Sequence, residues 1–189
     1  IILGLGLYIL VLFEPTPLTS GLIFVGILIH ALATRRIQFK KLWMITLSTT
    51  VSFVVVYLFF LLVFSFDLIA AFQYVLNDVV AYNVRSERGY WIWVAENLKE
   101  FIFATGIPVS IIFIYMLVFS LSNRLSAIKS NFLTRPEYTF LYSLAATFAF
   151  LWLMNVNRGE TTRLWIYLSV FFQVPAAVVM GQKVKSSRL

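Results

Sequence analysis

A short charged run lies between two long apolar segments near the end of the chain. Residues 157–163 read Asn-Arg-Gly-Glu-Thr-Thr-Arg, and the apolar segments cover residues 138–156 and 164–180. Charges between such segments are costly in a membrane unless they lie at its interface or line a polar site. The planar fork of a guanidinium binds two phosphate oxygens at once. Arg158 and Arg163 are therefore candidates for binding a lipid phosphate, and Glu160 for orienting an arginine or a sugar hydroxyl.

A second group of candidate residues lies in the longest segment between apolar stretches. It comprises two arginines and three aromatic residues, Arg85, Arg88, Tyr90, Trp91 and Trp93. Aromatic rings are typical of the membrane interface, so one interpretation is an interfacial belt. The other is a platform that faces a sugar or a lipid. For the arginines, the alternative to a binding pocket is an outer loop whose side chains reach headgroup phosphates.

The composition indicates a membrane protein. Of the 189 residues, 61% are hydrophobic and 12% are charged, and the mean hydropathy is +0.90. A soluble domain is about 45–50% apolar and about 25% charged. The chain has no cysteine, which excludes disulfides, thiolate metal sites and a cysteine nucleophile, and its single histidine, His30, excludes a multi-histidine metal site. No cofactor is evident, and nothing in the sequence indicates a divalent metal.

The apolar segments predict an all-α integral membrane protein with about six transmembrane helices, since roughly 20 apolar residues cross a bilayer. The segments cover residues 1–13, 18–33, 42–66, 101–121, 138–156 and 164–180. The first is too short to span and lacks the starting Met and charged flank of a signal peptide. We therefore expect a truncated first helix, and a single transmembrane domain over residues 1–189 that is the C-terminal fragment of a longer protein. Pro108 and Pro175 are expected to kink their spans.

An amphipathic helix is predicted over residues 67–82. Its apolar residues recur at spacings of three and four, namely Leu68, Ala71, Phe72, Val75, Val79 and Tyr82. Such a helix is expected to lie in the outer membrane interface. Further along, Glu96, Asn97 and the two charged residues that follow are expected to form the solvated start of the 101–121 span.

The distribution of Lys and Arg predicts the orientation of the chain. Residues 34–41, residues 122–137 and the tail after Gly181 hold 10 of the 15 basic residues and one acid. The positive-inside rule places these segments in the cytoplasm, and therefore residues 67–100 and 157–163 outside. The net charge of +7 does not indicate nucleic-acid binding, because no basic face is interleaved with exposed aromatic residues.

The run from Asn157 to Leu168 also resembles a pattern near the last spans of a group of bacterial polytopic membrane proteins. Those proteins resemble glycosyltransferases of the GT-C class, and residues 2–36 and 88–97 are similar to other parts of them. The resemblance implies an enzyme of the prokaryotic plasma membrane that transfers a sugar from a polyprenyl-phosphate donor on the outer face. The catalytic acid of that family lies in the first outer loop. No segment here matches that motif, so it is expected upstream.

Other classes of protein stay open. A lipid or small-solute transporter or flippase, with no chemistry, also suits kinked spans and outer arginines. The middles of the predicted spans hold no ionisable residue, whereas ion-coupled carriers usually keep some there. A structural subunit that binds partners through its spans is a third possibility, for which the sequence gives no positive sign. An acidic pair in an upstream outer loop would favour the transferase, and an inverted repeat of the spans would favour the transporter.

Overall fold

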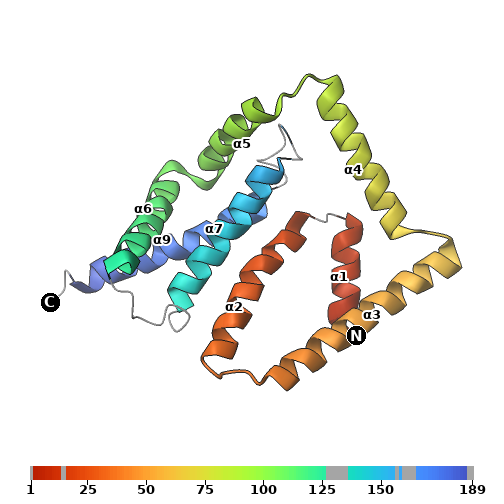
Figure 1. Cartoon of the computed structure of the whole chain (residues 1–189), viewed down its shortest axis with the longest axis horizontal. Helices are drawn as coiled ribbons and strands as arrows, with labels where there is room; N and C mark the ends of the chain where they lie inside the picture. Colours follow the sequence, from red (N-terminus) through yellow and green to blue (C-terminus); the bar gives the residue numbers. More distant parts are fainter. Residues whose placement is uncertain (1, 14–15, 127–135, 156–157, 159–164, 187–189) are drawn as a thin grey trace.

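The computed structural model describes residues 2–13, 16–126, 136–155, 158 and 165–186 (Figure 1). These residues form eight α-helices and one short 3-10 helix, with no strand among them, so the predicted all-α fold class is confirmed. In chain order they are α1 (Ile2–Phe13), η1 (Thr16–Ser20), α2 (Gly21–Ala33), α3 (Phe39–Phe64), α4 (Leu68–Arg85), α5 (Tyr90–Thr105), α6 (Ile107–Ser126), α7 (Pro136–Met154) and α9 (Ile166–Ser186).

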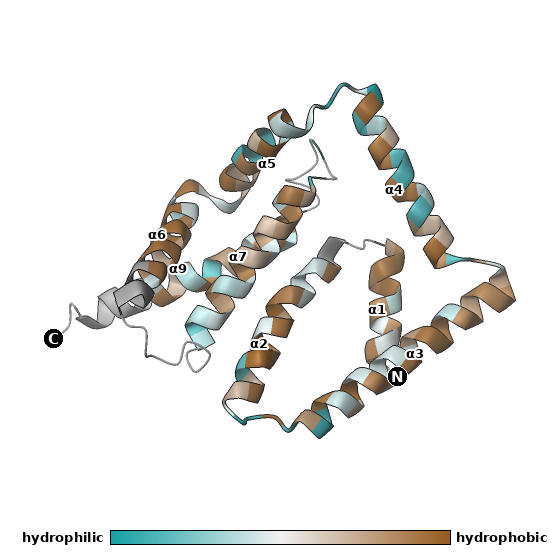
Figure 2. Cartoon of the chain, viewed as in Figure 1, coloured by the Kyte–Doolittle hydropathy of each residue, from teal (hydrophilic) through white to brown (hydrophobic). Residues whose placement is uncertain are grey.

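Two helices of the described chain, α3 and α7, are long and apolar enough to cross a membrane. The helices α5 and α6 together make a third span if the bent pair is counted as one. The helices α1 and α2 and residues 166–178 of α9 are apolar but shorter. Figure 2 shows this apolar character over most helices, with the polar residues more frequent on α4. Part of the chain is thus suited to a membrane, while six spans stay a prediction.

The main bundle consists of α2, α5, α6, α7 and α9, which pack around one apolar core. Its buried members are Ile23, Phe101, Phe113, Leu141, Leu144, Leu151, Trp165, Leu168 and Phe172. The Phe172 ring of α9 lies between two other rings, with centroid distances of 5.1 Å to Phe101 and 4.3 Å to Phe113. Because Phe101 belongs to α5 and Phe113 to α6, this stack fixes both helices on α9.

Two close helix pairs depend on glycine. An added Cβ at Gly4 of α1 would lie 2.5 Å from the Ser52 Cβ of α3. At Gly26 of α2 it would lie 1.7 Å from the Ser143 Oγ of α7. Both distances are too short for real atoms, so the two crossings require the absence of a side chain. The helices α1 and α3 lie outside the main bundle and pack along each other at the Gly4 crossing.

The predicted continuous span over residues 101–121 is divided into two helices. α5 ends at Thr105 and α6 starts at Ile107, and the two axes differ in direction by 108°. Gly106 between them has φ +95°, a backbone conformation that other residues rarely adopt. A kink was predicted at Pro108, and the structure has it two residues earlier, at Gly106. Pro108 lies in the first turn of α6, where its missing N–H breaks no hydrogen bond.

The predicted helix over residues 67–82 is present as α4, which continues to Arg85. Asp67 caps it, since its Oδ1 accepts hydrogen bonds from the N–H groups of Ile69 (2.9 Å) and Ala70 (3.1 Å). The Tyr57 hydroxyl of α3 donates to the same oxygen at 3.1 Å. No described helix packs along α4, which stands apart from the bundle in Figure 1 and joins α3 to α5.

Candidate functional site

Two arginines from distant parts of the chain meet at one end of the main bundle. Arg88 lies in the turn between α4 and α5, and Arg158 follows the end of α7. The Arg88 Nη1 donates a hydrogen bond to the carbonyl oxygen of Arg158, and the Arg158 Nη1 donates to the carbonyl oxygen of Arg88. Both side chains are half-buried. Each guanidinium thus lies against the backbone of the other residue, and the two hydrogen bonds join the two segments. We call Arg88 and Arg158 the arginine pair.

Aromatic rings surround the arginine pair. The Arg88 Cζ lies 4.9 Å from the centroid of the Tyr82 ring and 5.2 Å from that of Trp93. The Arg158 Cζ lies 5.5 Å from the centroid of the Tyr90 ring. The electron-rich face of an aromatic ring attracts a cation but carries no net charge. These rings therefore orient the guanidinium groups and leave their positive charge available to an anion.

Two buried asparagines connect α5 to the residue that follows α7. We call them the asparagine latch. The Asn97 Nδ2 of α5 donates to the Asn155 Oδ1 at 2.7 Å, and the Asn155 Nδ2 donates to the carbonyl oxygen of Tyr90 at 2.9 Å. Asn97 is 0% and Asn155 is 1% exposed. The Asn155 carbonyl oxygen also accepts from the Arg158 Nε at 3.2 Å, so the latch and the arginine pair are directly connected.

Two more hydrogen bonds join the end of α7 to the start of α5. The Tyr90 hydroxyl donates to the carbonyl oxygen of Leu153 at 2.6 Å, and the Trp152 Nε1 donates to that of Val94 at 2.7 Å. The last carbonyl groups of a helix have no partner within the helix. Tyr90 satisfies one of them in α7. The site is thus built on two helix ends that side chains hold together.

Arg85 is the one described arginine of the predicted site that does not join the pair. Its Nη2 lies 3.5 Å from the Asp78 Oδ1, and its side chain is 69% exposed. An exposed ion pair of this kind contributes little to stability. Arg85 has a carboxylate partner in Asp78, whereas Arg88, three residues later, has none among the described residues.

The other residues predicted for the site are Trp91, Glu160 and Arg163. The Trp91 side chain is 77% exposed, and its ring lies edge-on to Tyr90 with a centroid distance of 5.0 Å. Trp91 therefore supports Tyr90 from outside instead of facing the arginine pair through its own ring. Glu160 and Arg163 lie outside the described residues.

The arginine pair has no carboxylate partner among the residues whose placement is described. The ion pairs found there are Arg85–Asp78 and Lys99–Glu96. A guanidinium carries five N–H donors. The hydrogen bonds of the described residues use one donor of Arg88 and two of Arg158, all directed to neutral carbonyl oxygens. The chemistry that this arrangement offers is the binding of an anion by the remaining donors.

No metal-binding cluster is found in the described part of the chain, where no three His, Cys, Asp or Glu residues lie close enough to share an ion. The described carboxylates nearest to the site in sequence are Glu87, which precedes Arg88, and Glu96, which pairs with Lys99.

Sequence reasoning missed the asparagine latch. Asn97 was expected in a solvated helix start, and this prediction was wrong, because Asn97 is fully buried on the inner face of α5. A signal for this existed in the spacing. Val94, Asn97 and Phe101 lie three and four residues apart, which places them on one helical face. Asn155 has φ +45°, and nothing in the apolar segment before it indicated such a turn.

Comparison with protein-family models, curated proteins and solved structures finds no match to this chain. The likeness to GT-C glycosyltransferases stays an expectation from the sequence, and the site has to be interpreted from its own geometry.

Proposed function

We propose that this protein is a polytopic membrane protein that binds the phosphate of a polyprenyl-linked sugar donor at the arginine pair. In this proposal the chain is the C-terminal part of a GT-C-like glycosyltransferase. The observation that carries the proposal is the arginine pair itself, in which two half-buried arginines bind each other's backbone and have no carboxylate partner among the described residues.

Electrostatics explain why such a pair favours a phosphate. Both cations lie at one end of the bundle, where nearby rings and helices exclude water and strengthen electrostatic interactions. An anion bound there is attracted by both of them. A phosphate oxygen accepts charge-assisted hydrogen bonds, and several oxygens let one group accept from both guanidinium forks. A carboxylate has only two oxygens, which match one guanidinium fork but not two.

The proposed membrane arrangement has six spans, with α4 at the outer interface. In Figure 1 the connection between α4 and α5 lies at the upper edge of the molecule, whereas the connection between α2 and α3 lies near the lower edge. The basic segment 34–41 lies near this lower edge, so the proposal assigns the lower edge to the cytoplasm. This orientation places the arginine pair at the extracytoplasmic face of a prokaryotic plasma membrane.

In a sugar transfer the arginine pair would stabilise the charge that develops on the departing phosphate. A transfer also needs a base for the acceptor hydroxyl. In the proposal this group comes from upstream of the chain, and Arg163 and Glu160 are further candidates by their chemistry alone, Arg163 for the phosphate and Glu160 for orienting an arginine or a sugar hydroxyl.

The test is phosphate-lipid binding by the purified protein in phosphatidylcholine nanodiscs. We expect the single substitutions Arg88→Gln and Arg158→Gln each to weaken the affinity for undecaprenyl phosphate by about tenfold or more, since each removes a charge-assisted contact. Arg85→Gln is the matched control and should leave the affinity unchanged. Wild-type affinity in both site variants would refute the proposal.

A lipid transporter is the second candidate, and one observation favours it. The 108° break between α5 and α6 is a discontinuous apolar helix, and transporters commonly form their binding sites at such breaks. Proteoliposomes with a fluorescent polyprenyl phosphate separate the two functions. Movement of the label between leaflets without a sugar nucleotide or acceptor would favour a flippase, and a static label would favour the transferase.

A further inference from the structure

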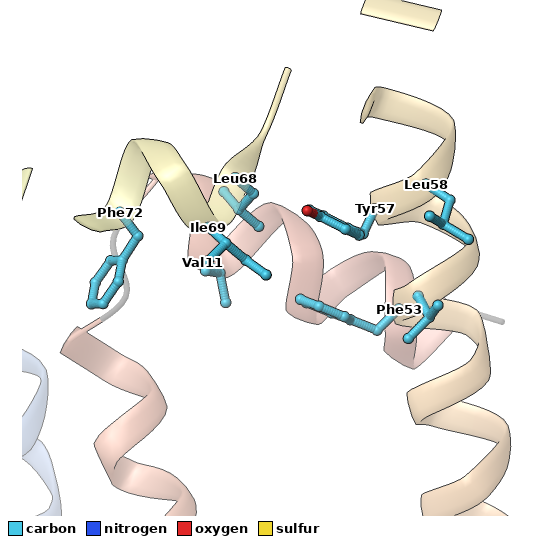
Figure 3. A pocket seen from close by; sticks show the side chains of 8 residues that line it. Val11, Phe53, Tyr57, Leu58, Leu68, Ile69 and Phe72 are labelled. Atoms are coloured by element: carbon cyan, nitrogen blue, oxygen red, sulfur yellow. The ribbon is translucent and has the colours of Figure 1, made fainter. Parts of the chain in front are cut away.

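An apolar cavity lies between α1, α3 and the first turns of α4 (Figure 3). Its volume is about 410 Å³, which falls in the range of small-ligand sites, about 300–1,000 Å³. Val11, Phe53 and Leu58 form part of its wall, and Leu68 and Phe72 line it from α4. The wall holds no charged residue, and the hydroxyl of its only tyrosine, Tyr57, is bound to Asp67. A ligand that fills this cavity must therefore be a hydrocarbon.

One face of α4 connects this cavity to the arginine pair. The face consists of Leu68, Phe72, Val75, Val79 and Tyr82, spaced by four, three, four and three residues. Its first two members line the cavity, and the ring of its last member lies under the Arg88 guanidinium. Between the two ends, Val75 is 56% exposed and no described helix covers it. At 1.5 Å per residue the face is about 21 Å long.

The two ends of this face suit the two ends of one amphiphile. The positive charge lies at one end only, and the apolar cavity lies at the other. A short apolar ligand would fill the cavity without using the arginine pair, and a small anion would use the pair without reaching the cavity. A lipid with a phosphate headgroup and a chain longer than about 21 Å uses both.

We propose that the cavity binds the distal part of the hydrocarbon chain of a long-chain lipid phosphate, whose chain lies along α4 from the arginine pair. The proposal rests on the proposed phosphate site and adds a second, apolar subsite to it. The protein then selects its lipid by chain length as well as by charge. The chain can be polyprenyl or acyl, and the two sources are separated by experiment.

The test compares two phosphates in nanodiscs, undecaprenyl phosphate and geranyl phosphate, whose two-isoprenoid chain is shorter than the face of α4. The wild-type protein should bind the longer lipid at least about tenfold more tightly, because only this lipid buries further methylene groups in the protein. Val11→Trp fills the cavity from α1 and should remove this preference while leaving the affinity for geranyl phosphate unchanged.

Ile9→Trp is the matched control, since Ile9 lies on the same helix, is exposed and does not line the cavity. It should keep the preference for the long chain. If Val11→Trp does not fold, Ile69→Trp fills the same cavity from α4 and carries the same expectation. Dioleoyl phosphatidic acid replaces the polyprenyl lipid in a parallel series, and a preference for it that Val11→Trp removes assigns the subsite to acyl chains.

Equal binding of long and short phosphates by the wild-type protein would overturn this inference, as would a full preference in the cavity-filled variants. Failure of the phosphate site gives a different result. In that case Arg158→Gln would bind geranyl phosphate as tightly as the wild-type protein, whatever the effect of chain length.

Discussion

The asparagine latch is the part of the site where single atoms matter most. Asn97 and Asn155 are fully buried, and each hydrogen bond between them and the start of α5 replaces contacts with water that burial removed. A buried polar atom that loses its partner costs much more than an exposed one. The latch therefore holds Asn155 in one conformation, and the Arg158 side chain depends on it through the bond to the Asn155 carbonyl oxygen.

Asn97→Ala tests this dependence. The substitution removes the donor to the Asn155 Oδ1 and leaves that oxygen buried, which should lower the free energy of unfolding by about 1–3 kcal/mol. Reversible unfolding in mixed micelles measures the change. Asn77→Ala, at an exposed position of α4, is the control and should have little effect. Equal stability of the two variants would show that the latch is not important for the fold.

At this scale the sequence predicted the types of the site residues better than their positions. Arg88, Arg158, Tyr90 and Trp93 were candidates from their chemistry, and the structure brings them together. Arg85 was an equally good candidate by charge and proximity in sequence, yet it pairs with Asp78. Contacts between segments 70 residues apart depend on how helices pack, which spacing along the chain does not report.

Among the helices, the break at Gly106 is the feature that departs most from what hydropathy predicts. An average over about 20 apolar residues does not register one residue with a positive φ, so the sequence predicted a continuous span. By contrast, the sequence predicted α4 from its periodicity, because apolar residues spaced by three and four identify both a helix and its apolar face. The signal for the break was present in the Gly106-Ile107-Pro108 run, which combines a permissive residue with a helix-starting one.

Gly106→Ala tests the break. An added Cβ there meets no atom within 4 Å, so the cost comes from the backbone alone. A side chain at φ +95° should lower the stability by about 1–3 kcal/mol. Thermal unfolding in detergent should show a lower Tm for this variant. Gly6→Ala, where space is also open but the backbone is helical, should keep or raise the Tm. The same Tm in both variants would contradict the structure at this point.

The cap of α4 should make its first turn sensitive to acid. Hydrogen bonds from the Ala70 N–H, the Tyr57 hydroxyl and the Ile69 N–H lower the pKa of Asp67 below its ordinary value of 3.8. A carboxylate with a lowered pKa in the folded state stabilises the fold above its unfolded pKa and loses this effect as the pH falls through the folded pKa. The first turn of α4 should therefore be protected above pH 3.8 and open progressively below it.

Hydrogen exchange of the Ile69 and Ala70 amides, corrected for the intrinsic exchange rate, measures this opening. Asp67→Asn keeps a capping oxygen but has no carboxylate to titrate. Its protection should be lower than that of the wild-type protein at neutral pH and should not change between pH 5 and pH 3. Parallel pH profiles for the two proteins would exclude Asp67 as the titrating group.

For the whole molecule, the sequence predicted the class of fold but not the pairing of its helices. Apolar composition was sufficient to predict helices in all the described apolar segments. It could not predict that α1 packs on α3 and α2 on α7, because a helix that is apolar all round has no preferred face. The structure resolves this through Gly4 and Gly26, whose missing side chains permit two close crossings.

The predicted orientation is testable because the chain has no cysteine, so that any introduced thiol is unique. Gln38→Cys and Ser86→Cys place exposed thiols in the 34–38 connection and in the turn before Arg88. In intact cells a membrane-impermeant maleimide should label Ser86→Cys at once and Gln38→Cys only after permeabilisation. The reverse pattern would invert the proposed topology, and labelling of both thiols would exclude a membrane between them.

Position 155 combines demands that only one amino acid meets in full. Its positive φ favours Asn, Asp or Gly, its side chain must donate to the Tyr90 carbonyl, and the same side chain must accept from Asn97. Glycine satisfies the first demand alone, and aspartate cannot donate when ionised. Related proteins that keep this site should therefore vary little at position 155, and those that change it should change position 97 as well. Such paired variation would identify true relatives of this chain even where hydropathy is all that they otherwise share.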